Sequence, residues 1–155
     1  MRFEFGNCKL EIKQRVMDEF NNYVQTGRRR NESGGILIGR YIQDSQNAVI
    51  DVCTTPQPED LQKRFFFQRN KKYHQKILNQ IWNKSSSTQN YLGEWHTHPE
   101  IKPTPSSHDL REWKKLLNKQ NDDIKYIFFI IVGIEEIGVW KGCTTCEKIV
   151  EMKGQ

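Results

Sequence analysis

The sequence has few cysteines, no long apolar run and no internal repeat, and these shortages exclude several classes of protein. Its 155 residues include four cysteines, which are too few and too scattered for a disulfide scaffold in a chain of this size. No apolar run reaches the length of a membrane span or of a signal-peptide core, and the mean hydropathy is -0.81. We therefore expect a soluble protein of the reducing cytoplasm.

The length of the chain indicates its number of domains, and its charge indicates the kind of partner that it binds. A chain of 155 residues can bury enough surface to fold without stabilising disulfides or metal ions, so we expect a single domain spanning residues 1–155. The net charge of +5 favours acidic partner surfaces. The basic run Arg28–Arg30 is interpreted as a solvated loop, because no stacking platform or recognition motif accompanies it. We expect binding to neither nucleic acid nor membrane.

The most informative stretch runs from Gly93 to Asp109 and gathers two histidines, a serine and an aspartate. Alternate side chains of a strand face the same way, so His96 and His98 can present two imidazoles to one metal ion. Asp109 follows a proline-rich loop and falls in the first turn of a predicted helix, where it can add a carboxylate oxygen. Three such ligands leave one position on zinc open, which is typical of a catalytic site.

Other interpretations of the same residues stay open. Ser106 three residues before Asp109 is also the signature of a helix start, with the serine as N-cap and the aspartate near the positive end of the helix dipole. Both roles are compatible.

His74 lies in a predicted helix without a matching ligand, so we interpret it as structural.

The spacing resembles the H-x-H-x10-D motif of the JAMM (MPN-plus, Mov34/PAD1) metallopeptidases. Here the motif reads HTHP at residues 96–99, ten residues from Pro99 to His108, and then Asp109. A second element of that family, a glutamate before a glycine-rich apolar strand, is similar to ESGGILIG at residues 32–39. The resemblance implies an α/β fold, namely a single mixed three-layer domain of the JAMM/MPN (cytidine deaminase-like) type, in which a central mixed β-sheet is flanked by helices.

The same resemblance implies a zinc-dependent peptidase or isopeptidase and assigns its residues. It implies that His96, His98 and Asp109 bind zinc, that Glu32 is the general base and that Ser106 stabilises the oxyanion.

Two further residues of this region have alternative roles. Strand alternation places Glu94 on the face of the two histidines, so it stays an alternative base. His108 has no role in that family, and we expect it to face solvent or substrate.

A closer resemblance, to the short bacterial deconjugases of CBASS anti-phage operons, rests on Arg64, Trp82 and residues 66–74, 91–100 and 103–109. It implies that the protein cleaves after the C-terminal tail of a cGAS-like nucleotidyltransferase or ubiquitin-like protein, reversing conjugation by E1/E2-like ligases. One alternative is a JAMM protease of a bacterial ubiquitin-like or sulfur-carrier pathway. The other is a non-catalytic MPN scaffold that binds partners through the same fold.

Hydrophobic periodicity predicts the remaining elements. We expect strands at residues 2–5, 34–41, 48–53, 64–68, 124–132 and 136–141, and helices at 9–24, 73–82 and 110–117. Residues 56–63 are expected to form a loop, the phenylalanines at 65–67 to pack in the core, and the tail to residue 155 to fray. For Cys143 and Cys146 we favour free thiols over a metal site or disulfide, because an isolated C-x-x-C is a weak signal.

Overall fold

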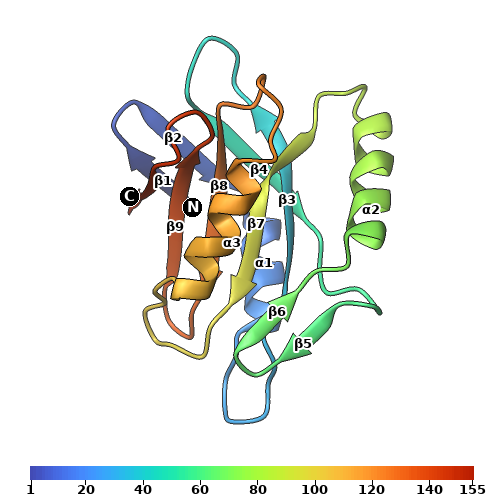
Figure 1. The fold of residues 1–155 in the computed structure, drawn as a ribbon, viewed down its shortest axis with the longest axis vertical. Helices are drawn as coiled ribbons and strands as arrows, with labels where there is room; N and C mark the ends of the chain where they lie inside the picture. The colour runs from blue at the N-terminus through green and yellow to red at the C-terminus, as the bar shows by residue number, and fades with distance from the viewer.

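The computed structural model describes residues 1–155 and contains eleven strands and three helices (Figure 1). The helices are α1 (Gln14–Tyr23), α2 (Lys71–Lys84) and α3 (Ser107–Leu117). The strands are β1 (Arg2–Phe5), β2 (Cys8–Ile12), β3 (Gly34–Tyr41), β4 (Ala48–Cys53), β5 (Leu61–Lys63), β6 (Phe66–Gln68), β7 (Asn90–Thr97), β8 (Tyr126–Val132), β9 (Ile137–Cys143), β10 (Ile149–Glu151) and β11 (Lys153–Gly154).

Nine of the strands form one mixed sheet in the order β10-β9-β8-β7-β3-β4-β2-β1-β11, and β5 and β6 form a separate hairpin. The pairs β2–β4 and β7–β8 are parallel, and every other pair is antiparallel. Side chains of β8 alternate between two hydrophobic clusters, one packed on α1 and the other on α3, so these helices cover opposite faces. The predicted three-layer arrangement of a mixed sheet flanked by helices is confirmed.

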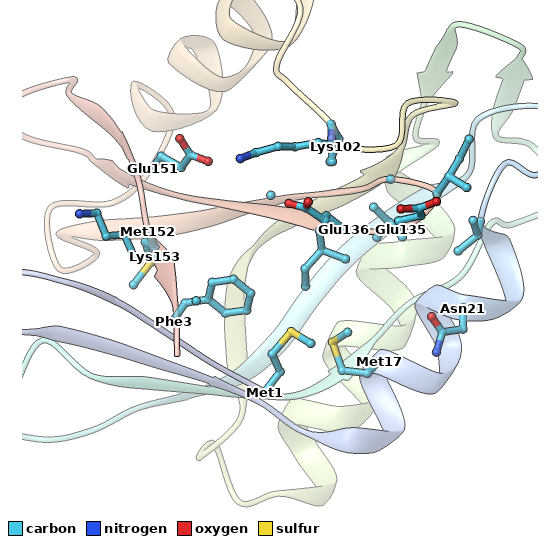
Figure 2. Close-up of a pocket in the computed structure, with 18 of the residues that line it drawn as sticks. Met1, Phe3, Met17, Asn21, Lys102, Glu135, Glu136, Glu151, Met152 and Lys153 are labelled. Atoms are coloured by element: carbon cyan, nitrogen blue, oxygen red, sulfur yellow. The ribbon is translucent and has the colours of Figure 1, made fainter.

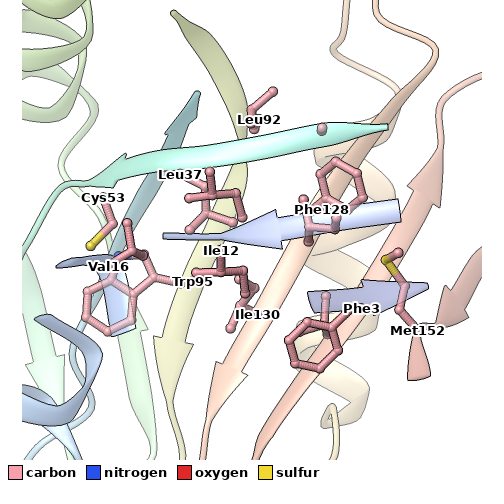
Figure 3. Close-up of a cluster of buried hydrophobic side chains, with 14 of the residues drawn as sticks. Phe3, Ile12, Val16, Leu37, Cys53, Leu92, Trp95, Phe128, Ile130 and Met152 are labelled. Carbon is pink, nitrogen blue, oxygen red and sulfur yellow. The ribbon is translucent and has the colours of Figure 1, made fainter. Parts of the chain in front are cut away.

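The larger cluster packs α1 against the sheet (Figure 3). Phe20 is fully buried, and its ring centroid lies 4.8 Å from that of Trp95 on β7. The helix begins at Gln14, so the prediction of a helix from residue 9 is wrong. Residues 8, 10 and 12 are buried with the period of two that a strand requires, and Ile12 fits both this pattern and the helical period that follows it.

The smaller cluster packs α3 against β8 and β9. The rings of Trp113 and Phe129 stack with centroids 4.5 Å apart and planes 9° apart, and Trp140 packs beside them. Because both faces of β8 are covered, its seven residues are almost uniformly apolar. The prediction of a central strand in this apolar run is therefore confirmed.

The C-terminal segment joins the two ends of the sheet, so the expectation that it frays is wrong. β10 pairs with β9 at one end, and β11 pairs with β1 at the other. Met152, between them, is 3% exposed and donates its backbone N–H to Val139 O at 2.8 Å. These pairings supply hydrogen-bond partners for edge strands that would otherwise be open.

The β5–β6 hairpin differs from its prediction in one place, and the helix that follows it buries His74. Residues 61–63 form β5 rather than a loop, because they pair with β6 across a two-residue turn. In α2 the fully buried side chain is His74, whereas Trp82 is 44% exposed. His74 lies between Thr54 Oγ1 at 2.6 Å and Asp60 Oδ2 at 2.9 Å, as expected of a structural histidine.

The cysteines fall into two groups. Cys143, the last residue of β9, is paired with Cys146 in a disulfide, contrary to the expectation of free thiols, whereas Cys8 and Cys53 are buried free thiols. Burial raises the pKa of Cys53 to about 12, so this thiol is unreactive at neutral pH.

No helix of the structure is both long enough and apolar enough to span a membrane.

Gly93 permits the close approach of β7 to β8. Its φ is +142°, and a Cβ atom there would lie 1.7 Å from the backbone oxygen of Phe128. We therefore expect Gly93→Ala to lower the free energy of unfolding by more than about 3 kcal/mol in urea denaturation, because β7 and β8 must separate. In the matched variant Gly154→Ala, the nearest atom lies at an ordinary 3.5 Å, and we expect a change within about 0.5 kcal/mol. Equal stability of the two variants would contradict this account.

Candidate metal centre

The two motif histidines lie where β7 ends. His96 is in β7, where its register partners are Gly34 on β3 and Ile131 on β8, so strands on both sides fix its backbone. His98 follows the strand, and its backbone N–H donates to Val132 O at 3.0 Å. As alternation predicts, both imidazoles face the same point, and their Nε2 atoms lie 3.0 Å apart.

The start of α3 brings the third motif residue to the same point. Ser106 is the N-cap residue, and its Oγ accepts from the backbone N–H of Asp109 at 3.1 Å. In return Asp109 Oδ2 accepts from the backbone N–H of Ser106 at 2.7 Å and from its hydroxyl at 2.6 Å. This capping box fixes the aspartate side chain. Asp109 therefore takes part in the helix start and also lies beside the two histidines, as both interpretations of the sequence predict.

The distances between the possible ligand atoms of these three residues suit a tetrahedral metal ion. Asp109 Oδ1 lies 3.2 Å from His96 Nε2, and Oδ2 lies 3.4 Å from His98 Nε2. Zinc bonds of the usual length, spread tetrahedrally, separate neighbouring ligand atoms by about 3.3 Å. All three ligand atoms lie within 4.8 Å of one another, and one tetrahedral position is left without a protein ligand. The residues therefore fit an open metal site.

The charges of this cluster favour a cation at its centre. Burial by itself would lower the pKa of His98, but hydrogen bonding and attraction to Asp109 raise it overall. Burial by itself would raise the pKa of Asp109, but hydrogen bonds from His96 and His98 hold it well below its usual range. Both shifts favour positive charge between the carboxylate and the imidazoles, which a metal ion supplies.

Glu32 also reaches the cluster, from the segment before β3. Its side chain is buried, and its Oε1 lies 3.9 Å from His98 Nε2. Burial raises the pKa of Glu32 to about 7, partly opposed by the charge of His98. A carboxyl group with this pKa can both accept and return a proton near neutral pH.

Glu94, the alternative base, is on the same strand as His96 but has different partners. Its Oε1 is bonded by the Arg69 guanidinium and accepts from the Tyr91 hydroxyl at 3.4 Å. It makes no hydrogen bond or ion pair with the three predicted metal ligands. This pairing favours Glu32 as the base.

The cluster opens into a cavity of about 390 Å³ walled by the β5–β6 hairpin and α3. Phe65 at the hairpin turn is 72% exposed and lines this cavity together with Phe66 and Phe67, so the expectation that the phenylalanines pack in the core is wrong. His108 is exposed and also lines the cavity, with its ring centroid 5.5 Å from that of Phe66, so it faces both solvent and the cavity. Sequence reasoning did not identify this wall, because an aromatic run indicates burial as readily as a binding surface.

A larger cavity, of about 1020 Å³, lies between α1, the β8–β9 turn and both chain ends (Figure 2). Its lining includes Met1, Met17 and Phe3, together with Glu135 and Glu136. None of the five predicted site residues lines it, and it contains neither histidine nor cysteine. The histidine and aspartate cluster that fits a metal ion lies in the smaller cavity.

The fold and the site together define a hydrolase of the JAB class. The chain belongs to the prokaryotic homologues of the JAB domain, whose family model matches residues 14–142.

Three relatives are each named CD-NTase/cGAS isopeptidase. The one from Vibrio cholerae is 32% identical over 96% of this chain and 90% of its own length. The one from Pseudomonas aeruginosa is 34% identical over 80% of this chain and 77% of its own. The one from Escherichia coli is 38% identical over 71% of this chain and 69% of its own.

A solved structure has a similar fold. The solution structure of a Desulfitobacterium hafniense protein aligns with a TM-score of 0.64 over 92% of this chain and 88% of that protein. At 17% identity, it supports the fold alone.

Proposed function

We propose that the protein is a zinc-dependent isopeptidase that frees a cGAS-like nucleotidyltransferase from proteins to which its C-terminus has been joined. The observation that carries this proposal is the convergence of two histidines and an aspartate, with the buried Glu32 carboxylate 3.9 Å from one of them. The names of the relatives support the substrate. The implied setting is bacterial anti-phage defence, where the protein reverses conjugation by E1/E2-like ligases.

In this proposal His96, His98 and Asp109 hold zinc. When bound there, zinc acts as a Lewis acid that polarises the scissile carbonyl and makes water acidic enough to attack it at neutral pH. Glu32 accepts the proton of the attacking water and returns it to the leaving amine, from its buried position beside His98. The Ser106 hydroxyl, which donates to Asp109 in the substrate-free site, turns toward the substrate oxygen as negative charge develops there.

Two alternatives predict different outcomes. A non-catalytic scaffold has no need of the Glu32 carboxylate beside a complete ligand set, and the presence of both argues against it. A JAMM protease of a ubiquitin-like or sulfur-carrier pathway shares the zinc centre, so only its substrate differs. We therefore compare cleavage of a reporter conjugated to a cGAS-like nucleotidyltransferase with cleavage of the same reporter conjugated to a bacterial ubiquitin-like protein. We expect faster release of the nucleotidyltransferase, and the reverse order would favour the alternative.

The two roles assigned to Ser106 can be separated by substitution. We expect Ser106→Ala to lose about 0.5–2 kcal/mol of stability with the helix cap, and about 100-fold or more in kcat with the hydroxyl. Glycine caps almost as well as serine, so Ser106→Gly should keep most of the stability and lose the same factor in kcat. Both variants are assayed at saturating zinc, with stability from thermal unfolding. Wild-type kcat in Ser106→Gly would restrict Ser106 to capping.

A further inference from the structure

The segment that carries Glu32 lies outside regular secondary structure and is held by the β5–β6 hairpin. Residues 31–33 belong to no helix or strand. The backbone N–H of Glu32 donates to Lys63 O at 2.8 Å, and its carbonyl oxygen accepts from Gln62 Nε2 at 3.0 Å. Both polar groups of this peptide backbone are therefore bonded to β5.

Gln62 makes two of its contacts through one nitrogen. Its Nε2 also donates to Ser33 Oγ at 3.1 Å, so the carboxamide holds two successive residues ahead of β3. The backbone oxygen of Gln62 in turn accepts from Asn31 Nδ2 at 3.3 Å. Asn31, Glu32 and Ser33 are thus all hydrogen-bonded to Gln62.

A second glutamine fixes the hairpin relative to the metal ligands. Gln25 is fully buried and donates to Arg64 O, in the hairpin turn, at 3.0 Å. Its Oε1 accepts from the hydroxyl of Thr97, which stands between the two histidines, at 3.0 Å. The hairpin therefore has a fixed position relative to the motif strand. Ser33 is also hydrogen-bonded to Thr97 directly, and Gln62 adds the bond to the Glu32 carbonyl oxygen.

The Glu32 carboxylate depends on its backbone for its position. It accepts no hydrogen bond from any protein group, and its nearest ionic neighbour is His98 at 3.9 Å. A misplacement of about 1 Å at a reacting group can cost about 100-fold in rate. A side chain that fixes the Glu32 backbone therefore affects the rate without contacting the substrate.

We propose that Gln62 is a positioning residue for Glu32, whose carboxamide fixes the backbone from which the base reaches the metal centre. This inference rests on the function proposed above. It concerns turnover rather than binding, because the contacts of Gln62 are with the Glu32 segment and Gln62 does not line the substrate cavity.

The test compares Gln62→Ala and Gln62→Glu with Lys63→Ala. Lys63 is the exposed neighbour on β5, and its alanine variant keeps the backbone oxygen that binds Glu32. At saturating zinc we expect kcat on the conjugate to fall about 10-fold or more in both Gln62 variants, because neither replacement donates a hydrogen bond. We expect KM and zinc content to match those of Lys63→Ala.

Amide hydrogen exchange at Glu32 gives a readout that needs neither metal nor substrate. We expect exchange at least about 10-fold faster in Gln62→Ala than in Lys63→Ala, because the segment opens more often. Exchange equal to the control, unchanged kcat, or a loss carried entirely by KM would each overturn the inference. An inactive wild type would instead contradict the proposed function, and the exchange rates would still decide whether Gln62 holds Glu32.

Discussion

Glu32→Gln is expected to reduce kcat by about 100- to 10,000-fold, the usual contribution of a general base, while the protein keeps its full zinc content. Glutamine matches glutamate in size but cannot accept the proton of the attacking water. It also removes a buried acid whose charged form is disfavoured by desolvation, so we expect no loss of folding stability. The measurement is single-turnover cleavage of the nucleotidyltransferase conjugate, with zinc determined by elemental analysis on the same samples.

The matched control is Glu94→Gln, which changes a half-buried glutamate of the same cavity. Because Arg69 and Tyr91 bond Glu94, we expect this variant to lose far less activity than Glu32→Gln. Full activity in Glu32→Gln together with an inactive Glu94→Gln would exchange the two roles and would contradict the assignment of the base.

Removal of a ligand should have the largest effect of all, because it removes the metal as well as the activity. We expect His96→Ala and Asp109→Asn to retain less than about a tenth of the wild-type zinc after dialysis, and to show no turnover above background. Asp109→Asn is the more specific test. Asparagine cannot supply the pair of carboxylate oxygens that lie 3.2 Å and 3.4 Å from the two imidazoles, yet its side-chain oxygen can still accept from the backbone N–H of Ser106, the N-cap residue.

His108→Ala is the control for this loss. His108 is adjacent to Asp109 in sequence but faces the aromatic wall of the cavity, so its removal should leave zinc content unchanged. Wild-type zinc in Asp109→Asn, or zinc lost equally in His108→Ala, would contradict the proposed ligand set.

The metal cluster was predictable from the sequence because its geometry is local. Alternation along one strand orients His96 and His98, and a helix start with a serine cap orients Asp109. The placement of Glu32 was different, because 64 residues separate it from His96 and its approach depends on pairing between β3 and β7. Only the resemblance to a family suggested it, and the distance of 3.9 Å to His98 supports that suggestion.

The surroundings of the site were not predictable in the same way. The aromatic run at residues 65–67 has the composition of a core strand, and only the hairpin geometry places it at the cavity wall. The tail beyond Cys143 has little periodicity, and its order comes from edges of the sheet that lie far away in sequence. Nothing in the sequence distinguishes Gln25 and Gln62 from other polar residues. Only the fold places Gln62 against the Glu32 segment and Gln25 against the motif strand.

The most direct test of a single-zinc isopeptidase is a zinc titration of the metal-free protein, followed by cleavage of the nucleotidyltransferase conjugate. We predict no cleavage without metal, and a rate that rises with added zinc and levels off at about one equivalent, the content of one three-ligand site. Cleavage at the full rate by the metal-free protein would contradict the account, as would the absence of cleavage at every zinc concentration.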